Sequence, residues 1–360
     1  MKQITNIVLT GGPCAGKTTA LAKIIHYFTY RGYAVYAQPE AATLFNQAGV
    51  NFLTADKSLF FESEKQLLSF QLRTEDCFRK MAEKAGKPAI IVYDRGVMDV
   101  AAYMNTDLWQ ALLDEMGLNE VDVRDKRYDA VLHLCTAAKG AEKFYTCENN
   151  SSRTENIETA VMLDDKIIKA WTGHPHLRVI PNTSTFEDKL NNVIAEISSV
   201  LGIPEPVETE RKFLVDVVGD IPDSREMDIF QTYLIARDGE EARVRKRGEN
   251  GHYAYFHTTK KAVSDNQRIE VERHITPSEY VSLKNSANPE KQEIHKLRRC
   301  FVWDNRYYEL DTFISPKLPH CLLEIEDVAK DEDISFPPFL NIIEEVTDNP
   351  DYYNVNISKR

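Results

Sequence analysis

One short segment, residues 11–18, constrains this chain more than any other part of its sequence. It reads Gly-Gly-Pro-Cys-Ala-Gly-Lys-Thr, which fits the pattern G-x-x-x-x-G-K-[ST]. An apolar run at residues 4–10 precedes it, and residues 18–30 follow with apolar side chains at helical spacing. In such a strand–loop–helix unit, glycines let backbone N–H groups wrap phosphate oxygens at the helix N-terminus. We therefore expect a nucleoside triphosphate to bind here, and we favour this over a plain glycine turn.

The residues of this loop have distinct expected roles. Lys17 would reach the β- and γ-phosphates, and the Thr18 hydroxyl would ligate Mg²⁺. The residues expected to contact the nucleotide are Gly11, Gly12, Pro13, Cys14, Ala15, Gly16, Lys17, Thr18 and Thr19.

Strands and helices alternate through residues 1–201, which predicts an α/β P-loop domain built on a parallel sheet with helices on both faces. Further strands are expected at residues 33–37, 89–93, 130–134 and 177–180, and long helices at residues 62–85 and 186–200. A glycine and two prolines then interrupt the pattern, so we expect a linker at residues 202–205.

Asp94 follows the apolar strand at residues 89–93, at the edge where a parallel sheet presents side chains to a ligand. We expect it to bind the Mg²⁺ ion that accompanies the nucleotide, although a residue here could instead cap the next helix. Arg95 would lie beside the phosphates. Glu40 ends the second strand, where it could hold an acceptor or a metal-bound water.

The expected catalytic set is Lys17, Glu40, Asp94, Arg95 and Arg153. Arg153 belongs to a stretch with Lys139 and Lys143 that could close over the phosphates as a lid, or could equally form a solvated basic face.

With its phosphate loop, its Asp94-Arg95-Gly96 turn and its lid with Arg153, this half resembles the P-loop ATPases of the NadR-like and nucleoside-monophosphate-kinase-like group. The resemblance implies phosphoryl transfer or NTP hydrolysis with Mg²⁺. The chain has no N-K-x-D motif of the kind that reads guanine in regulatory GTPases. ATP is therefore favoured, and GTP stays possible if another loop, near Asn182, reads the base.

Beyond residue 206 the chain consists of short segments in which charged and apolar residues alternate with period two. The alternating polar sets are Glu208, Glu210 and Lys212; Arg243, Arg245 and Arg247; Thr258 and Lys260; Glu270 and Glu272; Lys296 and Arg298; Glu309 and Asp311; and Glu324 and Glu326. Any solvated face of an antiparallel sheet would show such alternation, so each set alone is weak evidence. The ordered series is stronger evidence.

The series from Glu208-x-Glu210-x-Lys212 to Glu324-x-Glu326 resembles the CYTH family, the triphosphate tunnel metalloenzymes, and assigns residues 206–360 to such a domain. The resemblance implies an α+β domain with an antiparallel β-barrel tunnel that holds a triphosphate and one or two divalent cations. The basic residues expected to bind triphosphate are Lys212, Arg243, Arg245, Lys260, Lys296 and Arg298. The carboxylates expected to ligate Mg²⁺ or Mn²⁺ are Glu208, Glu210, Glu324 and Glu326.

Composition narrows the possible partners. The net charge of −12 over 360 residues argues against a general nucleic-acid binder. The six cysteines show no C-x-x-C pair, and no apolar run reaches transmembrane length. We expect a soluble, cytoplasmic protein.

The sequence thus predicts a P-loop phosphotransferase or NTPase fused to a domain that binds or hydrolyses a triphosphate, a fusion similar to proteins of the TRP/TRPL translocation-defect type. The alternative is a nucleotide-dependent regulatory or trafficking protein, driven by ATP or GTP. Its tunnel would then be a receptor for a phosphorylated ligand such as a phospholipid head group. In a third interpretation the tunnel domain is an inert scaffold that binds neither metal nor triphosphate.

Overall fold

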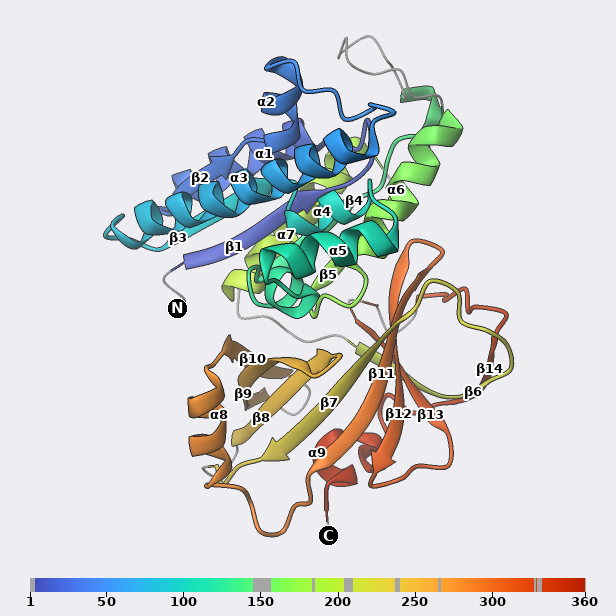
Figure 1. Cartoon of the computed structure of the whole chain (residues 1–360). Helices are drawn as coiled ribbons and strands as arrows, with labels where there is room; N and C mark the ends of the chain where they lie inside the picture. The colour runs from blue at the N-terminus through green and yellow to red at the C-terminus, as the bar shows by residue number, and fades with distance from the viewer. Residues whose placement is uncertain are drawn as a thin grey trace. The chain divides into compact units, whose positions relative to one another are not determined.

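The computed structural model describes residues 4–144, 157–182, 185–203, 210–236, 240–264, 267–326, 328 and 332–359. Contacts divide the chain into two compact units, Met1–Ile203 and Pro204–Arg360 (Figure 1).

A five-stranded parallel sheet forms the centre of the first unit, in the order β2-β3-β1-β4-β5. Its strands are β1 (Ile4–Thr10), β2 (Ala34–Gln38), β3 (Ala89–Asp94), β4 (Ala130–Leu134) and β5 (Leu177–Ile180). The central strand β1 lies between β3 and β4, and residues 11–16 leave its carboxyl end. The phosphate loop therefore opens at the point where the strand order reverses, which is the usual place for a ligand in such sheets.

Helices cover both faces of this sheet (Figure 1). They are α1 (Lys17–Tyr30), α2 (Ala41–Gln47), α3 (Lys57–Glu83), α4 (Val97–Ala101), α5 (Thr106–Met116), α6 (Ile157–Trp171) and α7 (Phe186–Leu201), with a π-helical turn at Val121–Asp125 and a 3₁₀ turn at Glu142–Phe144. Leu9 of β1 points to the face where α1 and α7 bury Phe28 and Val193 in one apolar cluster. Its neighbour Val8 points the other way, toward Trp171 of α6. The predicted α/β architecture is confirmed.

The second unit is built on a sheet of nine antiparallel strands in the order β10-β9-β8-β7-β11-β12-β13-β6-β14. They are β6 (Glu210–Val217), β7 (Arg225–Tyr233), β8 (Glu240–Glu249), β9 (His252–Ser264), β10 (Gln267–His274), β11 (Ile294–Trp303), β12 (Arg306–Ser315), β13 (Cys321–Glu326) and β14 (Leu340–Glu345). Helix α8 (Pro277–Lys284) lies against β8 and β9, and a 3₁₀ turn (Pro350–Tyr352) leads to α9 (Asn354–Ile357). The predicted second, antiparallel domain is confirmed.

Strands β6 and β13 are buried on both faces. Phe213 and Leu323 point into an apolar cluster closed by Phe339, whereas Leu214 and Leu322 point into a second cluster that contains Ile357 of α9. The second face also carries the charged side chains of these strands, because residues two apart on a strand share a face.

None of the described helices combines the length and the apolar character needed to cross a bilayer.

Candidate functional site

Two glycines give the phosphate loop its shape. Gly11 has φ of 141°, and a Cβ on it would stand 2.1 Å from the carbonyl oxygen of Leu134. Gly16, just before α1, has φ of 90°. Side chains at either position would strain the backbone. The Lys17 ammonium donates to the Gly11 carbonyl at 3.2 Å, so the lysine folds back across the loop that it belongs to.

Lys17 lies among charges of both signs. Burial lowers its pKa, and the nearby Arg95 guanidinium lowers it further. The carboxylates of Asp94, Glu40 and Asp99 act in the opposite direction. The predicted residues Lys17, Glu40, Asp94 and Arg95 are thus brought together at the carboxyl edge of the sheet. The exposed side chains of Thr18 and Thr19 stand at the start of α1.

Asp94 holds a carboxylate oxygen that lacks a donor. Asp94 pairs with Leu9 in the register of β3 and β1, beside the phosphate loop. Its Oδ1 is buried without a hydrogen-bond partner among the described residues, and burial raises its pKa against the pull of Lys17. The N-cap of α4 is Gly96, so Asp94 does not cap that helix. A buried hard oxygen without a donor suits a divalent cation, so this position fits the predicted Mg²⁺ site.

Arg95 is anchored from two sides. Its φ of 68° lies in the left-handed region, which is unfavourable for a residue with a long side chain. Its guanidinium meets Glu40 through Nε, and Asp99 at 3.2 Å through a terminal nitrogen. Asp99 in turn accepts from the Gly96 N–H at 2.8 Å and from the Trp171 indole at 3.1 Å. Burial would raise the pKa of Glu40, but Arg95 and Lys17 lower it, so Glu40 is a carboxylate at neutral pH.

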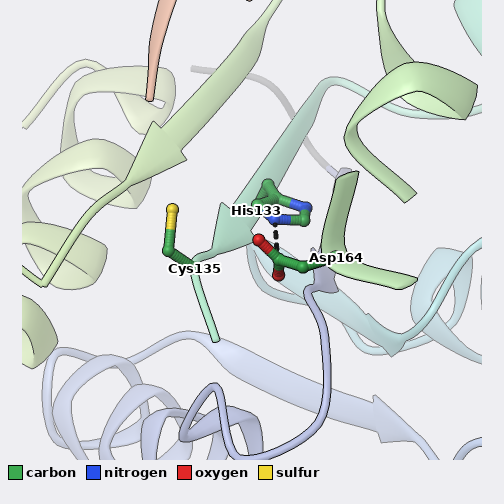
Figure 2. Close-up of side chains that lie close together, drawn as sticks. All are labelled: His133, Cys135 and Asp164. Atoms are coloured by element: carbon green, nitrogen blue, oxygen red, sulfur yellow. Dashed lines mark hydrogen bonds and ion pairs between the residues drawn. The ribbon is translucent and has the colours of Figure 1, made fainter. Parts of the chain in front are cut away.

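A buried cluster of His133, Cys135 and Asp164 adjoins the phosphate loop, as Figure 2 shows. One potential ligand atom of each lies within 4.8 Å of the other two. Asp164 Oδ1 accepts from the Gly12 N–H at 2.8 Å and lies 3.1 Å from His133 Nε2, and the Lys139 ammonium lies 2.8 Å from Oδ2. Burial, with the charge of Asp164, raises the pKa of Cys135 to about 12, so its thiol is protonated at neutral pH. Because the carboxylate is engaged and the thiol is neutral, this cluster anchors the loop and does not suit a metal ion.

Asp164 also fixes the start of the predicted lid. Lys139, the first of the three lid cations, is held by Asp164 and Asp165 of α6. Lys143 has an exposed side chain. The other lid cation, Arg153, lies outside the described residues, and so does Glu208 of the second unit.

Arg298 is the centre of a buried ionic network in the second unit. It lies on β11 opposite Asp311 of β12, and Glu309 of β12 lies opposite Glu324 of β13. This register brings the three carboxylates to one guanidinium, which contacts Asp311 at 2.7 Å and 2.6 Å and also binds Glu309 and Glu324. Lys296 binds Asp311 on the same strand pair. These side chains are nearly or fully buried.

Lys212 extends the network onto β6. Its ammonium lies 2.9 Å from Glu324 and 3.0 Å from Glu210. Burial would lower the pKa of Lys212, but these two carboxylates raise it above its usual value. The structure thus brings together five of the residues predicted for the tunnel: Glu210, Lys212, Lys296, Arg298 and Glu324.

Three of the other predicted tunnel residues lie on β8 and β9, on the far side of β7 from this network. Arg245 of β8 binds Glu272 of β10 at 2.9 Å. Arg243 and Lys260 lie near the Tyr233 hydroxyl: burial raises the pKa of Tyr233 to about 12, and both cations act against that shift. The side chain of Glu326 is exposed at the end of β13, opposite Glu210.

Comparison with protein families identifies the first unit. Residues 6–189 match a family model described as an AAA domain. The chain belongs to this AAA-domain family. None of the curated proteins compared with the chain matches it.

Solved structures similar to the chain cover parts of it. The inorganic triphosphatase NE1496 is 28% identical over 42% of this chain and 93% of its own, with a TM-score of 0.32. A thymidylate kinase from Ehrlichia chaffeensis is 20% identical over 56% of this chain and 100% of its own, with a TM-score of 0.35. The PH1819 protein from Pyrococcus horikoshii OT3 is 22% identical over 35% of this chain and 80% of its own, with a TM-score of 0.27.

The AAA domain also contains a buried carboxyl group without a described charge partner. Burial of Glu64 in α3 raises its pKa to about 7, so the folded domain keeps this proton while the unfolded chain loses it near pH 4.5. Glu64 therefore does not reduce the free energy of unfolding below pH 4.5. As the pH rises to 7, its buried proton lowers that free energy by up to about 3 kcal/mol.

We expect Glu64→Gln to stabilise the AAA domain at pH 8 and to have little effect at pH 4.5. A Trp303→Phe background leaves Trp109 and Trp171 of this domain as the tryptophan signal for urea unfolding. Glu62→Gln, which changes an exposed carboxylate in the same helix, is the control. An equal effect of Glu64→Gln at both pH values would contradict the prediction.

Proposed function

We propose that the AAA domain binds a nucleoside triphosphate with Mg²⁺ and transfers or hydrolyses its terminal phosphoryl group. The observation that carries this proposal is the buried Oδ1 of Asp94, which has no hydrogen-bond partner in the described part of the chain and lies one strand away from the glycine loop that positions Lys17. Asp94 and Thr18 are the residues that would hold the Mg²⁺ ion, which when bound would neutralise charge on the phosphate oxygens.

The chain's own residues would orient and polarise the phosphates. Loop N–H groups and the Lys17 ammonium would donate to the phosphate oxygens as negative charge shifts among them. Arg95 is held by Glu40 and Asp99, so its direction is fixed before a ligand arrives. Glu40 acts first as a positioning residue for Arg95, and it remains the candidate to hold an acceptor hydroxyl or water.

We expect Asp94→Asn to raise the Mg²⁺ concentration needed for half-maximal ATP binding roughly tenfold, because the change removes a metal-directed charge and keeps the shape. Calorimetric ATP titrations at stepped Mg²⁺ concentrations measure this. Asp107→Asn, at an exposed position of α5, is the control. An unaltered Mg²⁺ requirement would remove Asp94 from the metal site.

For the second unit we propose a CYTH-like site that binds triphosphate with Mg²⁺ or Mn²⁺. The buried cations Lys212, Lys296 and Arg298 support this, because they converge with carboxylates on one face of the sheet. Lysine and arginine side chains would turn from carboxylates to phosphate oxygens. Glu210 and Glu324 would then be released to hold the divalent cation.

The alternative function is a nucleotide-dependent switch whose second unit is a receptor for a phosphorylated ligand. It predicts that the second unit binds its ligand without turnover. The full chain carrying Lys17→Ala separates these functions, because its first phosphate site is disabled. We expect it to bind inorganic triphosphate and to release phosphate when Mg²⁺ or Mn²⁺ is present. Binding of triphosphate without release of phosphate would favour the receptor function, including a receptor for a phospholipid head group. If triphosphate did not bind, the second unit would be an inert scaffold.

A further inference from the structure

The ring of Phe186 lies directly against the phosphate loop. A Cβ on Gly16 would stand 2.6 Å from Phe186 Cε2 and 2.9 Å from its Cζ, so the ring occupies the space beside that glycine. Phe186 is the first residue of α7, and 49% of it remains exposed. An aromatic ring thus borders the phosphate loop on one side and solvent on the other.

Two helices hold this ring in place. Thr185 caps α7 and accepts from the Asp188 N–H at 3.2 Å. Lys23 of α1 pairs with Glu187 and donates to Asn191 at 2.7 Å, so the start of α7 is fixed to the helix that follows the phosphate loop. A ring held this way loses little conformational freedom when a ligand stacks on it.

The strand order indicates which end of the nucleotide meets Phe186. Asp94 ends β3, on one side of β1, whereas α7 follows β5, on the other side. Lys17 and the unpartnered Asp94 oxygen place the terminal phosphate on the β3 side. The nucleoside would therefore leave the loop toward β5 and α7, where the half-exposed ring of Phe186 lies.

The described polar side chains at the end of β5 are already engaged. The Asn182 amide nitrogen donates to the carbonyls of Thr136 and Lys139, both at 2.8 Å. Its amide oxygen accepts from the Lys189 ammonium at 2.7 Å, and that ammonium also donates to the Cys135 carbonyl at 2.6 Å. Asn182, near which the sequence left room for a loop that reads guanine, thus joins two loops, and both its amide nitrogen and its amide oxygen already have partners.

We propose that Phe186 is the platform on which the nucleobase of the bound triphosphate stacks, so that ATP and GTP are held with similar affinity. The proposal rests on the nucleotide-binding function proposed above. Stacking uses the face of a base, which every base presents, whereas discrimination requires hydrogen bonds to its edge. Phe186 is then a binding residue that sets the affinity for nucleotides. It does not select among the bases.

The test measures binding of Mg²⁺ complexes of ATP, GTP and inorganic triphosphate to the full chain. For each ligand, the part lost in Lys17→Ala defines the binding at the phosphate loop. We expect Phe186→Ala to weaken this binding about tenfold for both nucleotides and to leave it unchanged for inorganic triphosphate, which has no base. Phe186→Trp should retain nucleotide affinity, and Tyr30→Ala, an exposed aromatic residue at the end of α1, should change nothing.

The outcomes separate the platform from the phosphate site. Equal loss for nucleotides and inorganic triphosphate would show that the ring only supports Gly16, which would overturn the proposal. Unchanged nucleotide binding in Phe186→Ala would also overturn it. A preference of the unaltered chain for one base by more than tenfold would contradict readout by stacking alone. If no ligand shows Lys17-dependent binding, the proposed function itself is wrong, and the platform with it.

Discussion

Replacing Lys17 by alanine is expected to weaken nucleotide binding by the AAA domain more than 100-fold and to abolish turnover there. The ammonium lies at the centre of the site, where it donates to Gly11 and responds to the charges of Asp94 and Glu40. Loss of one well-placed donor to a developing phosphate charge typically costs a factor of about 100 to 1,000 in rate. Calorimetry with MgATP and a phosphate-release assay measure the two effects.

The fold should survive this substitution, because Lys17 is the first residue of α1 and Arg95 remains as a second cation beside Asp94 and Glu40. Lys80→Ala, at an exposed position of α3, removes a similar charge and serves as the control. Equal affinity and equal turnover in the Lys17→Ala and unaltered chains would refute a phosphate site at this loop.

The largest loss of stability is expected at Arg298. Arg298→Gln leaves Glu309, Asp311 and Glu324 buried around a neutral side chain, and breaking a buried ion pair in this way costs about 3–5 kcal/mol. Hydrogen exchange in β11, β12 and β13 measures the loss directly. The neighbouring Arg299 pairs with Glu226 at the surface, both about half exposed, so Arg299→Gln should cost less than about 1 kcal/mol.

The defect should also depend on pH. Burial would raise the pKa of Glu324, but Lys212, Lys296 and Arg298 lower it well below its usual range. The stability gained from this depression is present at neutral pH and disappears as the pH falls through the folded-state pKa. The difference between the unaltered chain and Arg298→Gln should therefore shrink in acid. A difference that stays constant with pH would show that shape, and not charge, makes Arg298 necessary.

Local patterns predicted much of the first unit. The expected strand at residues 4–10 is β1 to the residue, and the other four expected strands are present within one residue at either end. Hydrophobic runs and glycine positions are local properties, so the sequence contains them. The short helix α4 and the left-handed Arg95 depend on Trp171, which packs against Gly96, and on Glu40, which binds Arg95; both lie far away along the chain.

The position of Asp164 in the sequence indicates a buried carboxylate, which the sequence analysis did not predict. It stands four residues after Ala160 and four before Ile168, both buried, so it occupies an apolar position of an amphipathic helix. A carboxylate there needs buried donors, and the structure supplies the Gly12 N–H. Which donors it meets follows from how α6 packs, which no pattern within the helix records.

In the second unit, period-two alternation indicated that Lys212, Lys296, Arg298 and Glu324 lie on polar strand faces, and the structure buries these four side chains. It could not predict their partners. Arg298 meets three carboxylates because of the register between β11, β12 and β13, and a slip of one residue would turn these side chains to the other face.

The ionic network of the second unit would couple the binding of the two ligands proposed for it. Its acidic side chains act as internal counter-ions for its basic ones, so an anion that enters must compete with Glu324 and Asp311 for the same N–H groups. A divalent cation bound to these carboxylates would remove the competition, and the anion in turn would free the carboxylates that the cation needs. If the second unit binds both ligands as proposed, each alone should bind weakly, and each should strengthen the binding of the other by the same factor, as thermodynamic linkage requires.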